Sequence, residues 1–175
     1  MTGAAKAIGR TSSRLESFIR RLEAQRACLD WAAEAVQDVP GPVIELGLGN
    51  GRTFDHLRLR LGQSREIWAF DRHNAAHPAS QPDIDRLMLG DFRETLPAFA
   101  AQRPPFIALA HADIGSGDEE GTAALARWLG PALVPLLAPG ALVVSDQPLA
   151  VRTWRRMPLP AGVADGRYFI YRNDA

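Results

Sequence analysis

The first regular pattern of hydrophobic residues runs from about residue 12 to residue 38. Its apolar positions recur every three or four residues, as one face of an α-helix requires; they are Leu15, Phe18, Ile19, Leu22, Leu29 and Val36. Thr11, Ser12 or Ser13 can cap the start, and Ser13 and Glu16 have capping-box spacing. Two prolines within 38–42 end the pattern. We expect one long amphipathic helix covering one face or edge of a sheet.

After residue 42, short apolar runs alternate with helical patterns. We expect strands at 43–48, 66–71, 86–91, 105–112, 141–145 and 168–171, and helices at 51–62, 92–101 and 118–138. The run at 105–112 is continuously apolar, as a strand buried on both faces is. This alternation predicts a doubly wound, mostly parallel sheet in a three-layer α/β/α fold. We expect a single domain over 1–175, made of a helical preface (1–40), a core (41–148) and a short C-terminal segment (149–175).

Composition narrows the possible partners and location. The 20 basic and 20 acidic residues balance, which gives no electrostatic case for a nucleic-acid or membrane partner. Cys28 is the only cysteine, so an internal disulfide is excluded and a reducing cytoplasm is expected. No apolar run approaches the roughly 20 residues of a membrane span.

A glycine-punctuated turn follows the first expected strand. Gly47, Gly49 and Gly51 stand at alternate positions, where they remove the Cβ atoms that would keep a ligand off the backbone. A helix then begins at Arg52-Thr53, and its free N–H groups offer partial positive charge to an anionic group. We expect this turn to hold a nucleotide-like cofactor.

The spacing of the turn and one acid before it indicate which cofactor. Dinucleotide-binding oxidoreductases favour Gly-x-Gly-x-x-Gly, whereas the spacing here is Gly-x-Gly-x-Gly. Glu45 lies two residues before the first glycine, where it would repel a pyrophosphate and attract an ammonium group. A nicotinamide-dependent oxidoreductase is therefore disfavoured but stays an alternative.

Polar residues follow three further expected strands, at the sheet edge where such folds bind ligands. Asp71 can accept hydrogen bonds from both ribose hydroxyls of an adenosine. Asp91 can accept from an adenine amino group while Phe92 packs on the ring, and Asp91 can also cap the next helix. The fourth strand ends in the run 110–118, which contains His111 and Asp113.

The run Glu45-Leu46-Gly47-Leu48-Gly49-Asn50-Gly51 resembles motif I of the Rossmann-like S-adenosyl-L-methionine-dependent methyltransferases. With the strand-end acids, the resemblance covers 43–118, and the whole chain resembles a compact bacterial family of unassigned substrate. It implies a methionine end along the glycines, with Glu45 near its ammonium and its carboxylate near the helix start. The cofactor-binding residues expected in full are Glu45, Gly47, Leu48, Gly49, Asn50, Gly51, Arg52, Thr53, Asp71, Arg72, Gly90, Asp91, Phe92 and Ala112.

Methyl transfer needs little from the protein beyond alignment, which in intramolecular analogues contributes roughly 7–11 kcal/mol. A base is required only if the acceptor must first lose a proton. His111 and Asp113 are the candidate catalytic residues, because we expect both at the rim of the sheet. Asp113 would activate the acceptor or only organise its loop. Ser116 and Glu119 have the spacing of a capping box for the next helix.

The fifth expected strand ends in Asp146-Gln147, so Asp113, Asp146 and Gln147 would lie on neighbouring strands. Metal-dependent catechol-type O-methyltransferases bind magnesium there through oxygen ligands, but with asparagine where this chain has Gln147. Magnesium is a secondary alternative, and we expect no metal ligand.

The acceptor also stays open. A catalytically silent cofactor-binding protein is a further alternative. Because 149–167 is short where larger relatives carry a lid, we expect a small-molecule acceptor or a site enclosed by a second subunit. We expect a homo-oligomer formed through the N-terminal helix or the C-terminal segment, with Trp31 able to reach the cofactor.

Overall fold

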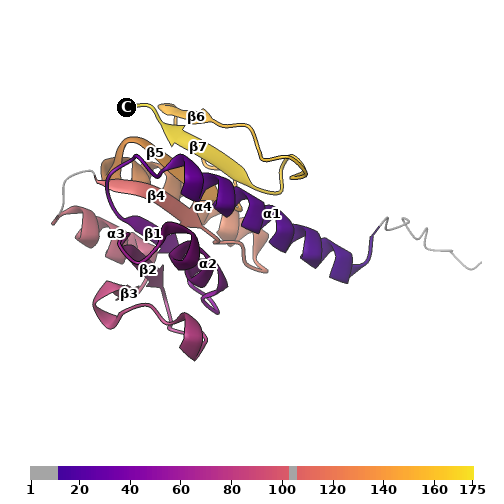
Figure 1. Ribbon diagram of the computed structural model, residues 1–175, viewed down its shortest axis with the longest axis horizontal. Helices are drawn as coiled ribbons and strands as arrows, with labels where there is room; N and C mark the ends of the chain where they lie inside the picture. The colour runs from indigo at the N-terminus through magenta and orange to yellow at the C-terminus, as the bar shows by residue number, and fades with distance from the viewer. Residues whose placement is uncertain (1–11, 103–105) are drawn as a thin grey trace, which may run out of the picture.

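A computed structural model describes residues 12–102 and 106–175. A seven-stranded sheet forms its centre, in the order β3-β2-β1-β4-β5-β7-β6 (Figure 1). In that order the strands are β3 (Leu87–Leu89), β2 (Ile67–Asp71), β1 (Val43–Leu46), β4 (Ile107–Ala112), β5 (Leu137–Ser145), β7 (Phe169–Asn173) and β6 (Trp154–Arg156). The strands from β3 to β5 in this order pair in parallel, whereas β7 pairs antiparallel with both β5 and β6. The predicted mostly parallel sheet is confirmed.

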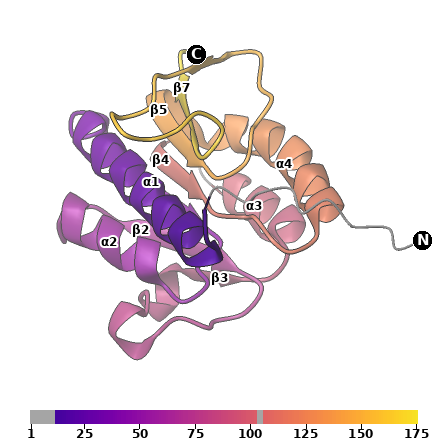
Figure 2. The ribbon, with the colours of Figure 1, turned by 90° about the vertical axis from the view of Figure 1, so that its right-hand side faces the viewer.

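Helices cover both faces of this sheet. α1 (Arg14–Ala35) and α2 (Arg52–Leu61) lie on one side, and α3 (Phe92–Ala100) and α4 (Glu119–Leu133) lie on the other (Figure 2). Three short 3₁₀ helices connect elements: η1 (Pro78–Ser80), η2 (Ile84–Arg86) and η3 (Val134–Leu136). The doubly wound three-layer α/β/α architecture is therefore confirmed. Within the described ranges, no helix has the length and apolar character needed to cross a membrane.

The alternation of side chains along each strand produces two cores. On β1, Ile44 packs toward α3 and α4, while the preceding Val43 packs toward α1 and α2. The six residues of β4 are all buried, as its continuous apolar run predicts. Each fully buried Leu, Ile or Phe contributes roughly 1.5–3 kcal/mol relative to an exposed one.

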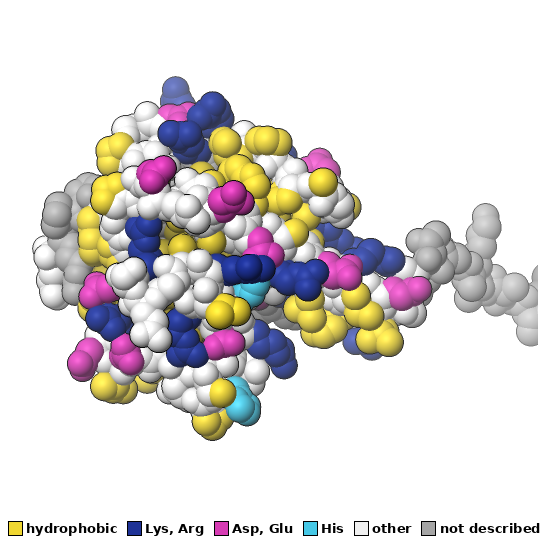
Figure 3. Space-filling view, in the orientation of Figure 1, with side chains coloured by type: hydrophobic (Ala, Val, Ile, Leu, Met, Phe, Trp, Pro, Cys, Tyr) yellow, Lys and Arg dark blue, Asp and Glu magenta, His cyan; other side chains and the backbone are white. Residues whose placement is uncertain are grey.

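The N-terminal half of α1 departs from the prediction. Ser13 and Glu16 do form the capping box, whereas Thr11 lies outside the described residues. However, Leu15, Phe18 and Ile19 are 67%, 49% and 45% exposed, so the prediction that they face the sheet is wrong. The reason is that these turns project beyond the sheet, and hydrophobic side chains lie along the projecting part (Figures 1 and 3). The helix packs instead through a mostly small-residue face further along: Ala24, Gln25, Cys28, Leu29, Ala32 and Ala33.

Smaller differences occur in the second half of the chain. Asp118 caps α4 by accepting from the backbone N–H of Gly121, so the expected Ser116–Glu119 capping box is wrong. The helix ends at Leu133, and β5 begins earlier than expected, at Leu137. The strand β6 was not predicted, because three residues with two exposed arginines show no strand pattern.

Candidate cofactor site

Two adjoining cavities lie where the parallel strands end, at the edge at which such sheets bind ligands. The first has a volume of about 430 Å³ and is bordered by the loops after β1 to β4 and the start of α4. The second, of about 290 Å³, lies between the glycine turn and α1. Gly47, Asp71, Asp113 and Gly115 line both cavities. The two cavities therefore adjoin, and the first has room for a larger group than the second.

The glycine turn brings backbone into direct contact with this space. Gly47 has φ +92°, and a Cβ built there would lie 2.2 Å from the carbonyl oxygen of Asp113. Gly49 has φ +49°, and a Cβ there would meet no atom within 4 Å. Gly51 caps α2 with no side-chain hydrogen bond to its first N–H groups. The turn therefore fits a ligand that approaches the backbone over Gly49.

Asp71 ends β2 beside this turn. Its Oδ2 atom accepts from the backbone N–H of Gly49 at 2.9 Å, and its side chain lines both cavities. The acid therefore holds the glycine turn in place and borders the ligand space.

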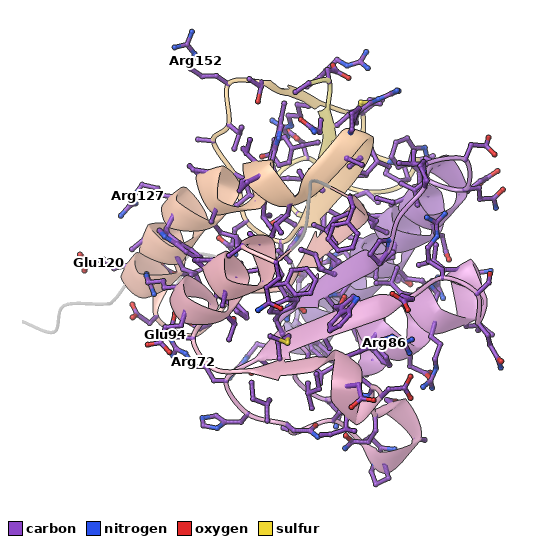
Figure 4. The ribbon with its side chains drawn as sticks, turned by 90° about the vertical axis from the view of Figure 1, so that its left-hand side faces the viewer. Arg72, Arg86, Glu94, Glu120, Arg127 and Arg152 are labelled. Atoms are coloured by element: carbon purple, nitrogen blue, oxygen red, sulfur yellow. The ribbon has the colours of Figure 1, made fainter. Side chains whose placement is uncertain are left out.

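Asp91 combines the two arrangements that the sequence allowed. It caps α3 by accepting from the backbone N–H of Arg93 at 2.9 Å, and it also forms an ion pair with Arg72 at 2.9 Å. The backbone hydrogen bond first, and then Arg72, lower the pKa of Asp91. Arg72, Asp91 and Phe92 all line the first cavity, and Figure 4 labels Arg72 at this edge of the molecule. The expected contacts Gly90 and Ala112 line neither cavity.

Glu45 and His111 lie below the cavities, so the expected placement of His111 at the rim is wrong. Both side chains are completely buried, because β1 and β4 pair them in register on the face that α1 and α2 cover. The His111 Nδ1 atom lies 2.7 Å from Glu45 Oε2, and the Thr53 hydroxyl donates to Glu45 Oε1. Burial alone would lower the pKa of His111, but the charge and hydrogen bond of Glu45, with Asp113 and Asp146, raise it overall.

Three residues that the sequence did not single out extend this network. The Tyr168 hydroxyl lies 3.4 Å from His111 Nε2 and accepts from Gln25 Nε2 at 2.7 Å. Gln25 Nε2 also donates to Asp113 Oδ2 at 2.9 Å, and Arg21 Nη2 donates to Asp113 Oδ1 at 2.7 Å. Burial raises the pKa of Tyr168, so it remains a neutral phenol. A chain of polar contacts thus connects Glu45, below the glycine turn, to Gln25 on α1.

The helix α1 reaches the site, but not through the residue expected. Phe18, Arg21, Leu22 and Gln25 line the second cavity, whereas Trp31 packs against the core between α1, α2 and the sheet. The four-residue spacing of Arg21 and Gln25 places them on one helix face, a signal that the sequence contained.

Asp146 is occupied by its own loop. Its carboxylate accepts from the backbone N–H groups of Ile114 and Gly115, at 3.0 and 2.9 Å, and from the Gln147 amide at 3.2 Å. Burial, and then the nearby charge of Asp113, raise the pKa of Asp146. Across residues 12–102 and 106–175, no group of three or more His, Cys, Asp or Glu side chains is arranged to hold a metal ion. These residues do not fit the magnesium site of the catechol-type pattern.

Comparisons with known proteins agree with this geometry. The family model described as S-adenosyl-L-methionine methyltransferase matches residues 12–173. A search of curated proteins found no match. Among solved structures, an S-adenosyl-L-methionine methyl transferase from Silicibacter pomeroyi DSS-3 is 46% identical, with TM-score 0.88, covering 93% of this chain and 99% of that one.

Two more distant structures share the fold. Cofactor-bound Rv0187 from MTB is 15% identical, with TM-score 0.58, and the match covers 97% of this chain and 93% of that one. An O-methyltransferase from Bacillus cereus in complex with SAH is 14% identical, with TM-score 0.51, and the match covers 81% of this chain and 68% of that one.

Proposed function

Because the chain belongs to the S-adenosyl-L-methionine methyltransferase family, we propose that it transfers the methyl group of this cofactor to a small-molecule acceptor. We further propose that the chain acts as one domain. One observation carries the assignment of the binding site. Gly47 of the glycine turn, Asp71 and Asp113 border both of the adjoining cavities.

We propose that the adenosine lies in the first cavity and the methionine end in the second. Asp71 would accept from the ribose hydroxyls, and Asp91 and Phe92 would border the adenine. The backbone from Gly47 to Gly51 would lie against the methionine end. A carboxylate there would also meet the uncapped N-terminus of α2. When bound, the cofactor supplies a methyl group on a positively charged sulfur, a good electrophile for in-line displacement.

The residues at the junction of the cavities favour alignment over proton transfer. Asp113 and Gly115 line both cavities, so the loop after β4 borders the place where the acceptor would meet the methyl group. Both oxygens of Asp113 accept hydrogen bonds from α1, and His111 has no exposed surface. We therefore propose a binding role for Asp113 and a supporting role for His111, in place of acceptor activation. Alignment of this kind is worth roughly 7–11 kcal/mol in model reactions.

The acceptor class can be tested with cofactor carrying a radiolabelled methyl group. The wild-type chain and Asp71→Ala would each be incubated with the small-molecule, protein and nucleic-acid fractions of a bacterial extract. We expect label from the wild type in the small-molecule fraction and little from the variant. Label in a macromolecular fraction would contradict the small-molecule acceptor. Tight cofactor binding without transfer to any fraction would instead support a catalytically silent binding protein.

We also propose that a second copy of this chain packs on the projecting half of α1. Leu15, Phe18 and Ile19 form an exposed apolar row there. At about 100° per residue, Glu16 and Glu23 lie on one side of this row and Arg14 on the other. Two copies that meet through the row with their helices parallel would place acidic sides against basic sides.

Light scattering on wild type, on the double variant Leu15→Glu with Ile19→Glu, and on Leu59→Glu tests this proposal. Leu59 is 78% exposed on α2 and serves as the control. We expect a dimer for wild type and control and a monomer for the double variant. A wild type that is monomeric at every concentration would rule the proposal out.

A further inference from the structure

The position of Glu45 leaves the ammonium of the methionine end without the partner that the sequence indicated. Glu45 is completely buried, and its two oxygens accept from Thr53 and contact His111. It lines neither cavity. An α-amino acid group in the second cavity must therefore be recognised by other residues.

The second cavity contains an ion pair that can take this role. Arg21 Nη2 lies 2.7 Å from Asp113 Oδ1, and the two side chains are 39% and 22% exposed. Both line the second cavity, one from α1 and the other from the loop after β4. The pair therefore borders the expected methionine end with one positive and one negative charge.

Building on the proposed function, we propose that Arg21 and Asp113 together recognise the amino-acid end of the cofactor. The Arg21 guanidinium binds the carboxylate of the cofactor, and the Asp113 carboxylate binds the ammonium of the cofactor. A zwitterion carries the same two charges as the pair, so each side chain exchanges one partner of opposite charge for another. A ligand without the amino-acid end has nothing to exchange, and the pair gives it no preference.

The surrounding contacts keep Asp113 in place during such an exchange. Gln25, which is 6% exposed, donates to Asp113 Oδ2 and to the Tyr168 hydroxyl through the same amide nitrogen. The backbone N–H of Asp113 donates to the Leu46 carbonyl at 3.0 Å. Asp113 is therefore held independently of Arg21, while a guanidinium has five N–H donors to share between two carboxylates.

Calorimetric titration with two ligands separates this role from a structural one. S-adenosylhomocysteine has the amino-acid end, and 5′-methylthioadenosine shares the adenosine and sulfur but lacks that end. For Arg21→Ala we expect at least a tenfold loss of affinity for S-adenosylhomocysteine and an unchanged affinity for 5′-methylthioadenosine. Arg20→Ala is the matched control, because Arg20 is exposed on the same helix and lines neither cavity; both affinities should stay within twofold.

A third ligand separates the contribution of the cofactor's ammonium from that of its carboxylate. Decarboxylated S-adenosylmethionine keeps the ammonium, so Asp113→Asn should weaken its binding while Arg21→Ala should not. If Arg21→Ala weakens S-adenosylhomocysteine and 5′-methylthioadenosine equally, or weakens neither, the proposal is overturned and the cofactor assignment stands. If the wild type binds no S-adenosylhomocysteine, the proposed function itself fails.

Discussion

The imidazole of His111 and the carboxylate of Glu45 form a pair with no solvent exposure, joined at 2.7 Å between Nδ1 and Oε2. The pair connects β1 to β4, two neighbouring strands of the sheet, beneath the glycine turn. The Thr53 hydroxyl, at the start of α2, donates a hydrogen bond to the same carboxylate. Any change in the pair is therefore expected to alter both the stability of the chain and the shape of the turn.

Replacing Glu45 with Ala should strongly destabilise the chain. The change leaves His111 buried without its charged partner, and breaking a buried pair in this way costs about 3–5 kcal/mol. Urea unfolding would measure the loss. Glu34→Ala, at an exposed position of α1, should change the free energy of unfolding by no more than about 0.5 kcal/mol. A similar small effect for Glu45→Ala would show that the pair is not needed for the fold.

The same pair should make stability depend on pH. The folded-state pKa of His111 is raised above its unfolded value of about 6.5. The stabilisation from its proton is therefore fully present below that pH and is lost as the pH rises through the folded pKa. We expect the free energy of unfolding to fall over this window in wild type and in His73→Gln, an exposed histidine, but much less in Glu45→Gln. Equal slopes in all three would refute the assignment to His111.

Asp71→Ala should weaken cofactor binding. The carboxylate positions the glycine turn through Gly49 and is the proposed acceptor of the ribose hydroxyls. Hydrogen bonds to charged groups contribute about 1.5–3 kcal/mol, so the affinity for S-adenosylhomocysteine should fall roughly 10- to 100-fold. Calorimetry would measure this, with Asp85→Ala, at an exposed residue of η2, as the control. Unchanged affinity in Asp71→Ala would remove the ribose contact from the proposed site.

Two glycines of the turn should respond differently to alanine. Both have positive φ, but a Cβ at Gly47 would meet the Asp113 carbonyl oxygen at 2.2 Å, and one at Gly49 would meet nothing within 4 Å. We expect Gly49→Ala to cost about 1–2 kcal/mol of stability for the backbone conformation. Gly47→Ala should cost about 1–3 kcal/mol more for the steric overlap. Thermal unfolding would compare the stability of the two variants. Equal losses of stability would mean that the loop after β4 can shift away from the added Cβ at little cost.

Cys28 should resist thiol reagents in the folded chain. It is completely buried in α1, and burial raises its pKa to about 11, so almost no thiolate forms at pH 8. We expect slow reaction with a colorimetric disulfide reagent in buffer and complete reaction of one thiol in concentrated urea. Fast reaction in buffer would show that α1 separates from the sheet.

The sequence predicted those features that depend on local pattern. The six residues of β4, the capping box of α1 and the acids that end β2 and β3 each follow from neighbouring residues. The glycine turn was also found, because alternate glycines directly after a buried strand indicate a sharp turn whose backbone a ligand can approach.

Features that depend on how distant elements meet were not predicted. The alternation of β1 and β4 places Glu45 and His111 on the same face only once their register is known. Arg21 and Gln25 appear as ordinary polar residues of a helix until α1 is placed across the loop after β4. Leu15, Phe18 and Ile19 were expected to face the sheet, because periodicity does not tell how far a helix extends beyond its sheet.

Gln25 and Tyr168, which are 143 positions apart, meet at 2.7 Å beneath the second cavity. The floor of the cofactor site can therefore close only after residue 168 has been synthesised. Nascent or proteolytically shortened chains that end after β5 contain the glycine turn and the strands from β3 to β5 in the sheet order, but they lack this contact. Immobilised S-adenosylhomocysteine should therefore retain chains that include Tyr168 better than chains that end after β5.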